Sequence, residues 1–280
     1  MQTAKKGIDL SNWQAELTDP RILTDAGVEF AILKLSEGRG FEDRSFSDFY
    51  DMCRSAGIAV GAYVYSHASD ARGGEAEAEY ALKLLGGREL ELPVYLDIEG
   101  DILSAGKAAL MASAVAFGKK IRSAGYRAGV YASLYPFRTV LNSAELRNEG
   151  FSVWCAAYNS SGPGIECDIW QYSNTGKLSG YPGDVDMDRM LNDILSEPPG
   201  TGLTGGEAAE KRWSAEMATL CRGFYGTQVE LLQIALGLEP SGVFDGNTER
   251  AVRTFQNTCG ISPDGIAGPQ TFSKLKETLK

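Results

Sequence analysis

Leu92-Pro93-Val94-Tyr95-Leu96-Asp97-Ile98-Glu99 is an apolar run that ends in two acids. It has the pattern of a buried strand, and side chains two apart on a strand share a face, so Asp97 and Glu99 should emerge together. Burying two neighbouring carboxyl groups is costly and drives their pKa values apart. A glycosidase uses such a pair, with one carboxyl as proton donor and one as anion. An isolated Asp-x-Glu is more often a strand that runs into a solvated turn.

Seven other short apolar runs have the length of strands, and helical patterns separate several of them. The runs cover residues 7–10, 29–35, 58–65, 128–131, 153–158, 169–172 and 185–187, and the helical patterns cover 46–56, 75–85, 104–124 and 143–148. The later runs are close together and leave little room for helices. We therefore expect an α/β fold, an irregular TIM-like (β/α) barrel over residues 1–195.

The carboxyl ends of the expected strands carry acids and aromatic residues, and active sites of such barrels lie at this rim. Aromatic rings stack on the C–H faces of sugars while carboxylates bind hydroxyl groups, so the set fits a carbohydrate better than a phosphate or a nucleotide. For any single aromatic residue, packing in the core is the more common role. The rim set is Asp9, Lys34, Glu37, Tyr63, Tyr65, Asp97, Glu99, Tyr131, Tyr158, Trp170, Tyr172, Asp186 and Asp188.

Charge and residue counts argue against several other functions. The net charge is −10, whereas a nucleic-acid-binding protein carries a basic face. His67 is the only histidine, too few for the ligands of a zinc hydrolase, and no serine or cysteine lies in a nucleophile motif. Five cysteines without Cys-x-x-Cys spacing favour reduced structural thiols. We expect neither a metal nor a cofactor.

Six segments, taken in order, carry a family resemblance. They are residues 7–14 (GIDLSNWQ), 32–38 (ILKLSEG), 61–63 (GAY), 95–99 (YLDIE), 169–173 (IWQYS) and 185–188 (VDMD). Together they resemble glycoside hydrolase family 25, the Chalaropsis-type lysozymes common in phage endolysins, over roughly residues 5 to 195. One departure is Val64-Tyr65, where many members have His-Phe.

The resemblance implies a bacteriolytic N-acetylmuramidase that cuts the β-1,4 bond from N-acetylmuramic acid to N-acetylglucosamine in peptidoglycan. It places the acid at Glu99 and companion carboxylates at Asp9, Asp97 and Asp186. The candidate substrate contacts at the rim are Tyr63, Tyr131, Tyr158, Trp170, Lys34 and Asp188.

Spacing leaves the mechanism open. Retaining enzymes with a protein nucleophile place the two carboxyl groups about 5–5.5 Å apart, and inverting enzymes about 6.5–9.5 Å. Side chains at i and i+2 of a strand have Cβ atoms nearly 7 Å apart, roughly twice the rise per residue, so rotation satisfies either. We favour a retaining, substrate-assisted route in which Asp97 orients the substrate's own acetamido group as nucleophile. A side-chain nucleophile is the alternative.

After the barrel, residues 196–216 are rich in Pro, Gly and Thr at the start and indicate a linker, with a helical segment beginning near Glu207. Residues 217–280 form the expected small all-α domain. Two similar turn sequences each precede a helix, at 241–248 (SGVFDGNT) and 263–271 (PDGIAGPQT). This part resembles the three-helix peptidoglycan-binding domain of wall hydrolases. We expect Asp245 and Asp264 to shape turns rather than bind calcium.

Two hypotheses therefore stand: a muramidase with a wall-binding tail, or a non-catalytic wall-binding protein on a decayed barrel. The intact Asp9, Asp97, Glu99 and Asp186 favour the enzyme. No apolar stretch has the length of a signal peptide or a membrane span. We therefore expect synthesis in the cytoplasm, no membrane insertion and no nucleic-acid partner. As in a phage or prophage endolysin, bacterial peptidoglycan would be reached only after release.

Overall fold

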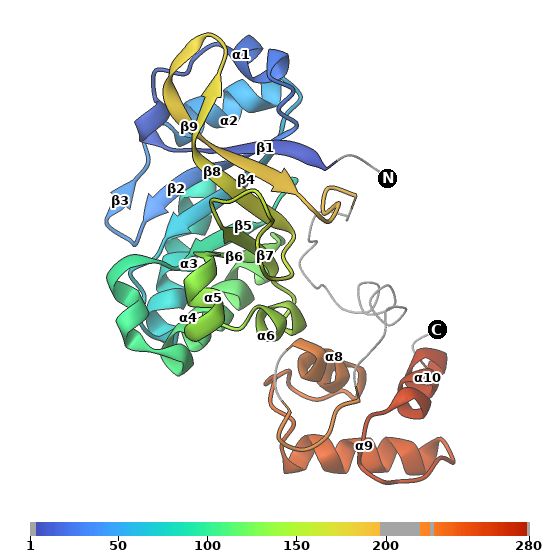
Figure 1. Ribbon diagram of the computed structural model, residues 1–280. Helices are drawn as coiled ribbons and strands as arrows, with labels where there is room; N and C mark the ends of the chain where they lie inside the picture. The colour runs from blue at the N-terminus through green and yellow to red at the C-terminus, as the bar shows by residue number, and fades with distance from the viewer. Residues whose placement is uncertain (1–3, 197–218, 225–226, 279–280) are drawn as a thin grey trace. The chain divides into compact units, whose positions relative to one another are not determined.

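The computed structural model describes residues 4–196, 219–224 and 227–278. The chain divides into two compact units, an N-terminal one that holds the strands and a C-terminal one that is helical (Figure 1). The expected helix near Glu207 and nearly all of the expected linker lie outside the described residues.

Nine strands build the N-terminal unit within its described residues. They are β1 (Lys5–Leu10), β2 (Phe30–Glu37), β3 (Phe41–Glu42), β4 (Ala59–Tyr65), β5 (Val94–Asp97), β6 (Ala128–Ser133), β7 (Ser152–Ala156), β8 (Ile169–Leu178) and β9 (Tyr181–Met190). The helices between them are α1 (Pro20–Asp25), α2 (Phe46–Ser55), α3 (Ala71–Leu85), α4 (Lys107–Ser123), α5 (Leu134–Thr139) and α6 (Ser143–Asn148), with short 3₁₀ turns η1 (Asn12–Gln14) and η2 (Gly100–Ala105).

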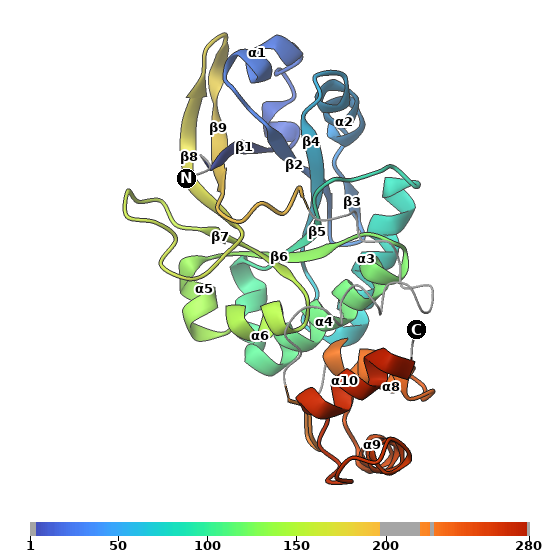
Figure 2. The same cartoon turned by 90° about the vertical axis from the view of Figure 1, so that its right-hand side faces the viewer.

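Eight of these strands close into a barrel. The sheet order is β1-β9-β8-β7-β6-β5-β4-β2-β3, and pairing of β1 with β2 joins the ends, while β3 only extends β2. Seven of the barrel strands, β1, β2 and β4 to β8, run parallel, whereas β9 is antiparallel to both of its neighbours, β8 and β1. Helices cover the outside of β2 to β6, and a loop without a helix joins β7 to β8 (Figure 2). The irregular (β/α) barrel predicted from the sequence is confirmed.

Two apolar layers hold this barrel. The outer layer lies between the strands and the helices, and the inner layer fills the barrel with Phe30, Tyr95, Trp154 and other large side chains. Glycine makes room for these rings, because a Cβ at Gly129 would lie 2.3 Å from the ring of Tyr95. Side chains alternate between the two faces of each strand, so every second residue points toward the barrel interior, where the polar rim residues also lie.

The C-terminal unit contains α8 (Thr227–Ala235), α9 (Gly246–Thr258) and α10 (Pro269–Thr278), packed on a small core that includes Leu232, Phe244 and Val252. Its two turns are built alike. The Gln233 amide donates to Ser241, Val243 and Thr248, and its oxygen accepts from Gly242. The same arrangement recurs 23 residues later, where the Gln256 amide donates to Asp264, Ile266 and Thr271, and its oxygen accepts from the backbone N–H of Gly265.

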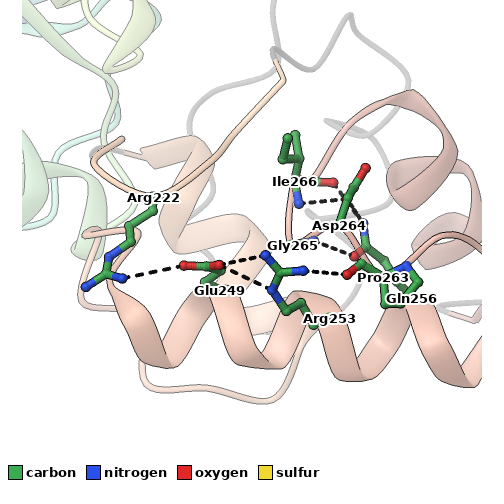
Figure 3. A network of polar contacts seen from close by, with 8 residues as sticks. All are labelled: Arg222, Glu249, Arg253, Gln256, Pro263, Asp264, Gly265 and Ile266. Atoms are coloured by element: carbon green, nitrogen blue, oxygen red, sulfur yellow. Dashed lines mark hydrogen bonds and ion pairs between the residues drawn. The ribbon is translucent and has the colours of Figure 1, made fainter.

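Figure 3 shows some of the hydrogen bonds of Gln256 beside the ion pairs that Glu249 of α9 makes. Glu249 lies between Arg222 and Arg253, and Arg253 also donates to the carbonyl oxygen of Pro263. The Asp264 carboxylate accepts from Gln256 and from the backbone N–H of Ile266, and Asp245 caps α9 through Asn247 and Thr248. Both aspartates therefore shape turns, as expected from the sequence.

Candidate active site

Asp97 and Glu99 lie where β5 ends. Asp97 is the last residue of the strand, and Glu99 continues it in an extended conformation (φ −151°, ψ 178°) before η2 begins. Asp97 is 4% exposed and its buried Oδ1 has no hydrogen-bond partner within the described residues, whereas Glu99 is half-buried. Burial raises the pKa of both carboxyl groups, and the charge of Glu99 raises the pKa of Asp97 further.

Three more acids come from β1 and β9. Asp9 pairs with Asp186 across the two strands, and Gly7 pairs with Asp188, so all three carboxyl groups project from one face. Burial raises the pKa of each: well above the ordinary range for Asp9 and to about 8 for Asp188. Asp9 and Asp186 thus lie at the rim as the sequence predicted. Asp188, predicted to contact substrate, is instead completely buried beneath them, with Trp154 Nε1 donating to its Oδ1 at 2.8 Å.

Gln171 on β8 organises this cluster, and the sequence analysis did not single it out. Its Nε2 donates to Asp9 Oδ2 at 2.7 Å, and its Oε1 accepts from the hydroxyl groups of Tyr131 and Tyr158, each at 2.9 Å. The two phenols therefore fix the amide so that its N–H faces Asp9. The signal was available, because Gln171 lies two residues after the inward-facing Ile169 and so shares its face.

Lys34 and Tyr63 come from neighbouring strands, at paired positions of β2 and β4. The ammonium group of Lys34 donates to Glu37 at 3.1 Å and lies 5.2 Å from the ring centre of Tyr65. Its charge opposes the rise in pKa that burial causes at Asp97 and Glu99. Tyr63 is half-buried, and its ring packs edge-on against Trp154. His67 Nε2 is 3.2 Å from Glu37 Oε1, at the outer end of this chain of contacts.

Trp170 does not join the other predicted residues. Because Ile169 and Gln171 face inward, Trp170 faces the outside of the barrel, where its Nε1 donates to the carbonyl oxygen of Ala157 at 2.8 Å. A cavity of about 500 Å³ on this side is lined by Trp170, Tyr172, Arg189 and others, and Tyr158 is shared between it and the acid cluster.

The described residues contain no group of three or more His, Cys, Asp or Glu side chains arranged for a metal ion. All five cysteines are free, and Cys53, Cys155 and Cys167 are buried. Within the same described ranges, no helix is long and apolar enough to cross a bilayer.

Comparison with known proteins assigns the chain that carries this cluster to a family. Residues 8–181 match the model of glycosyl hydrolases family 25. The chain belongs to that family. It is therefore a glycoside hydrolase of the lysozyme type. Residues 225–275 match the putative peptidoglycan binding domain model.

Relatives of this family 25 enzyme include an autolytic lysozyme of Clostridium acetobutylicum, 28% identical over 97% of this chain and 79% of that protein. Lysozyme M1 of Streptomyces globisporus is 30% identical over 66% of this chain and 67% of its own length. Among solved structures, the bacterial lysozyme from Streptomyces coelicolor superposes with a TM-score of 0.60 at 27% identity, covering 69% of this chain and 94% of that one.

Proposed function

We propose that this enzyme hydrolyses the β-1,4 bond between N-acetylmuramic acid and N-acetylglucosamine in peptidoglycan. The observation that carries the proposal is the pair of acids at the end of β5, with Glu99 close enough to Asp186 of β9 to feel its charge and Asp186 paired with Asp9 of β1. Glu99 is the proton donor. It is half-buried and therefore reachable by a sugar, and its raised pKa keeps the carboxyl group protonated closer to neutral pH.

Asp97 holds the substrate's acetamido group in this proposal. Its buried Oδ1 has no hydrogen-bond partner within the described residues, and a sugar N–H supplies the missing donor. The acetamido oxygen then attacks the anomeric carbon as Glu99 protonates the leaving oxygen. Glu99 next takes a proton from a water molecule whose oxygen attacks the anomeric carbon; the bond to the acetamido oxygen breaks, and the configuration is retained. Asp9 and Asp186 position sugar or water, and Lys34, Tyr63, Tyr131 and Tyr158 contact the glycan.

Digestion of purified peptidoglycan tests the bond that is cut. The products are reduced with borohydride and analysed by mass spectrometry. We expect reduced N-acetylmuramic acid at the new chain ends, whereas reduced N-acetylglucosamine would identify a glucosaminidase and refute the proposal.

Substrate assistance has its own test. Walls whose muramic acid residues have lost the N-acetyl group lack the proposed nucleophile, so their cleavage should fall by at least a hundredfold, while acetylated walls from the same strain are digested normally. Cleavage of both walls at equal rates, together with a covalent glycosyl-enzyme detected by mass spectrometry, would instead establish a side-chain nucleophile.

The C-terminal unit is proposed to bind the wall, in keeping with its family match. A lysozyme of Lactococcus phage mv1 is also similar, 25% identical over 65% of this chain and 96% of that lysozyme. This likeness supports a role as a phage or prophage endolysin. Cells that express the protein internally should lyse only after their inner membrane is permeabilised. Lysis without permeabilisation would contradict that role.

A further inference from the structure

The cavity on the outer side of β8 has no part in the reaction described above. Its volume is about 500 Å³, and its walls come from the loop that follows β7 and from the β8–β9 hairpin. Trp170 and Arg189 are paired across the two strands of this hairpin and share its outward face. Tyr172 follows two residues after Trp170 and lines the same cavity.

Arg189 is the one charged side chain among the described residues that line the cavity. Its guanidinium carbon lies 4.9 Å from the centre of the Tyr172 ring, and that ring lies 5.8 Å from the ring of Trp170. Within the described ranges, Arg189 makes neither an ion pair nor a hydrogen bond. The Tyr172 ring therefore holds a cation whose N–H groups remain available to a ligand.

The chemistry of the lining favours a carboxylate within a peptide. The chain has 37 acidic residues against 27 basic ones, yet no acid is among the residues that line the cavity. A guanidinium presents a planar fork of N–H donors that matches a carboxylate, whereas a neutral sugar gains little from its charge. Short hydroxyl and amide side chains, which suit the backbone of a peptide, complete the wall, and they include Ser160, Asn174 and Thr175.

Tyr158 connects the cavity with the acid cluster. Its hydroxyl group donates to Gln171 Oε1 at 2.9 Å, and Gln171 in turn donates to Asp9, while the Tyr158 residue also lines the cavity. A substituent on a sugar that is bound at the acids therefore has only Tyr158 to pass before it reaches Arg189. In peptidoglycan, muramic acid carries such a substituent, a peptide stem with free carboxylate groups.

We propose that this cavity is a subsite for the peptide stem of peptidoglycan, in which Arg189 binds a stem carboxylate while the sugar chain occupies the acid cluster. The inference rests on the proposed function, because the stem is attached to the muramic acid whose bond the enzyme cuts. Tyr172 acts as a positioning residue that supports the guanidinium from below. The subsite makes the enzyme prefer glycan that carries acidic peptides.

Two forms of one synthetic soluble muropeptide oligomer test this preference. They are identical except that the stem carboxylates are free in one form and converted into neutral methylamides in the other. For the full-length parent, we expect the amidated form to have a KM about tenfold higher, because the charge-assisted hydrogen bonds to Arg189 are lost. The value of kcat should stay within about twofold, since the cavity contains none of the reacting groups.

Arg189→Gln should show the higher KM on both forms, so that its preference for the free carboxylate disappears. Arg72→Gln is the matched control, because Arg72 is an exposed residue of α3, which lies across the barrel from β8 (Figure 2), and this variant should keep the parental preference. Equal KM values for the two forms in the parent, or the same ratio of KM values in the parent and in Arg189→Gln, overturn the proposal. A failure of the proposed function is seen in a different measurement, as reduced N-acetylglucosamine at the chain ends that the parent releases from walls.

Discussion

Gln171→Met removes the amide that connects the phenols to Asp9 while keeping the length of the side chain. In the parent, the amide donates to Asp9 Oδ2 and accepts from Tyr131 and Tyr158. The variant leaves Asp9 without its N–H donor. It also leaves the buried Tyr131 hydroxyl without an acceptor, whereas Tyr158 is 54% exposed and can turn to water.

The loss of these two hydrogen bonds sets the expected change in the free energy of unfolding. A hydrogen bond to a charged group contributes about 1.5–3 kcal/mol, and a buried hydroxyl left unsatisfied costs about 1–3 kcal/mol. We therefore expect the free energy of unfolding of the barrel to fall by about 4 kcal/mol. Because Asp9 also loses its orientation, wall digestion should slow by about a hundredfold under conditions where the variant is folded.

Urea unfolding followed by tryptophan fluorescence measures the first effect, since the ring of Trp154 lies 4.3 Å from that of Tyr131. Gln270→Met is the matched control, the same chemical change at an exposed position of α10, and it should stay within about 0.5 kcal/mol of the parent. The reasoning is refuted if Gln171→Met is as stable as this control and digests walls at the parental rate.

Three further changes test other parts of the molecule. Glu99→Gln keeps the shape of the acid but removes its proton, so the rate should fall by about a thousandfold or more with the fold intact; lysis within tenfold of the parent would contradict the assignment. His67→Ala should keep at least a tenth of the wall-lysis rate, because His67 contacts Glu37 at the edge of the site and a carboxylate mechanism needs no imidazole; complete inactivation of a folded variant would revive a histidine mechanism. Truncation before Glu197 should weaken pelleting with intact walls and slow their lysis, yet leave turnover of a short soluble muropeptide oligomer unchanged, and equal binding of walls by the truncated and full chains would show that the tail is not the wall anchor.

The sequence predicted the barrel because its signals are local. Each apolar run has the length of a strand, and the run from 92 to 99 contains β5 (Val94–Asp97). Two features were missed for the same physical reason. The β2–β3 hairpin and the short helices α1 and α5 depend on how loops pack on the closed barrel, which local periodicity does not record.

Side-chain direction was harder to predict than strand position. Trp170 and Gln171 are neighbours in one motif, but alternation sends the tryptophan outward and the glutamine to Asp9. The antiparallel course of β9 explains Asp188 in the same way. Along a strand that approaches from the rim, the second acid of the Asp-x-Asp motif lies deeper than the first, so Asp186 is half-buried and Asp188 is fully buried.

Five acidic side chains lie at one end of the barrel, and their negative charges would repel one another if all five were ionised. Lys34 is the cation whose charge opposes the raised pKa values of Asp97 and Glu99, and it is shared with Glu37. The remaining negative charge is limited by retained protons, because burial raises the pKa of Asp9, Asp186 and Asp188 as well. Such protons leave as pH rises, so the same arrangement that keeps Glu99 as an acid makes the barrel less stable on the alkaline side of neutrality. Proton donation and the stability of the barrel therefore depend on pH in the same direction.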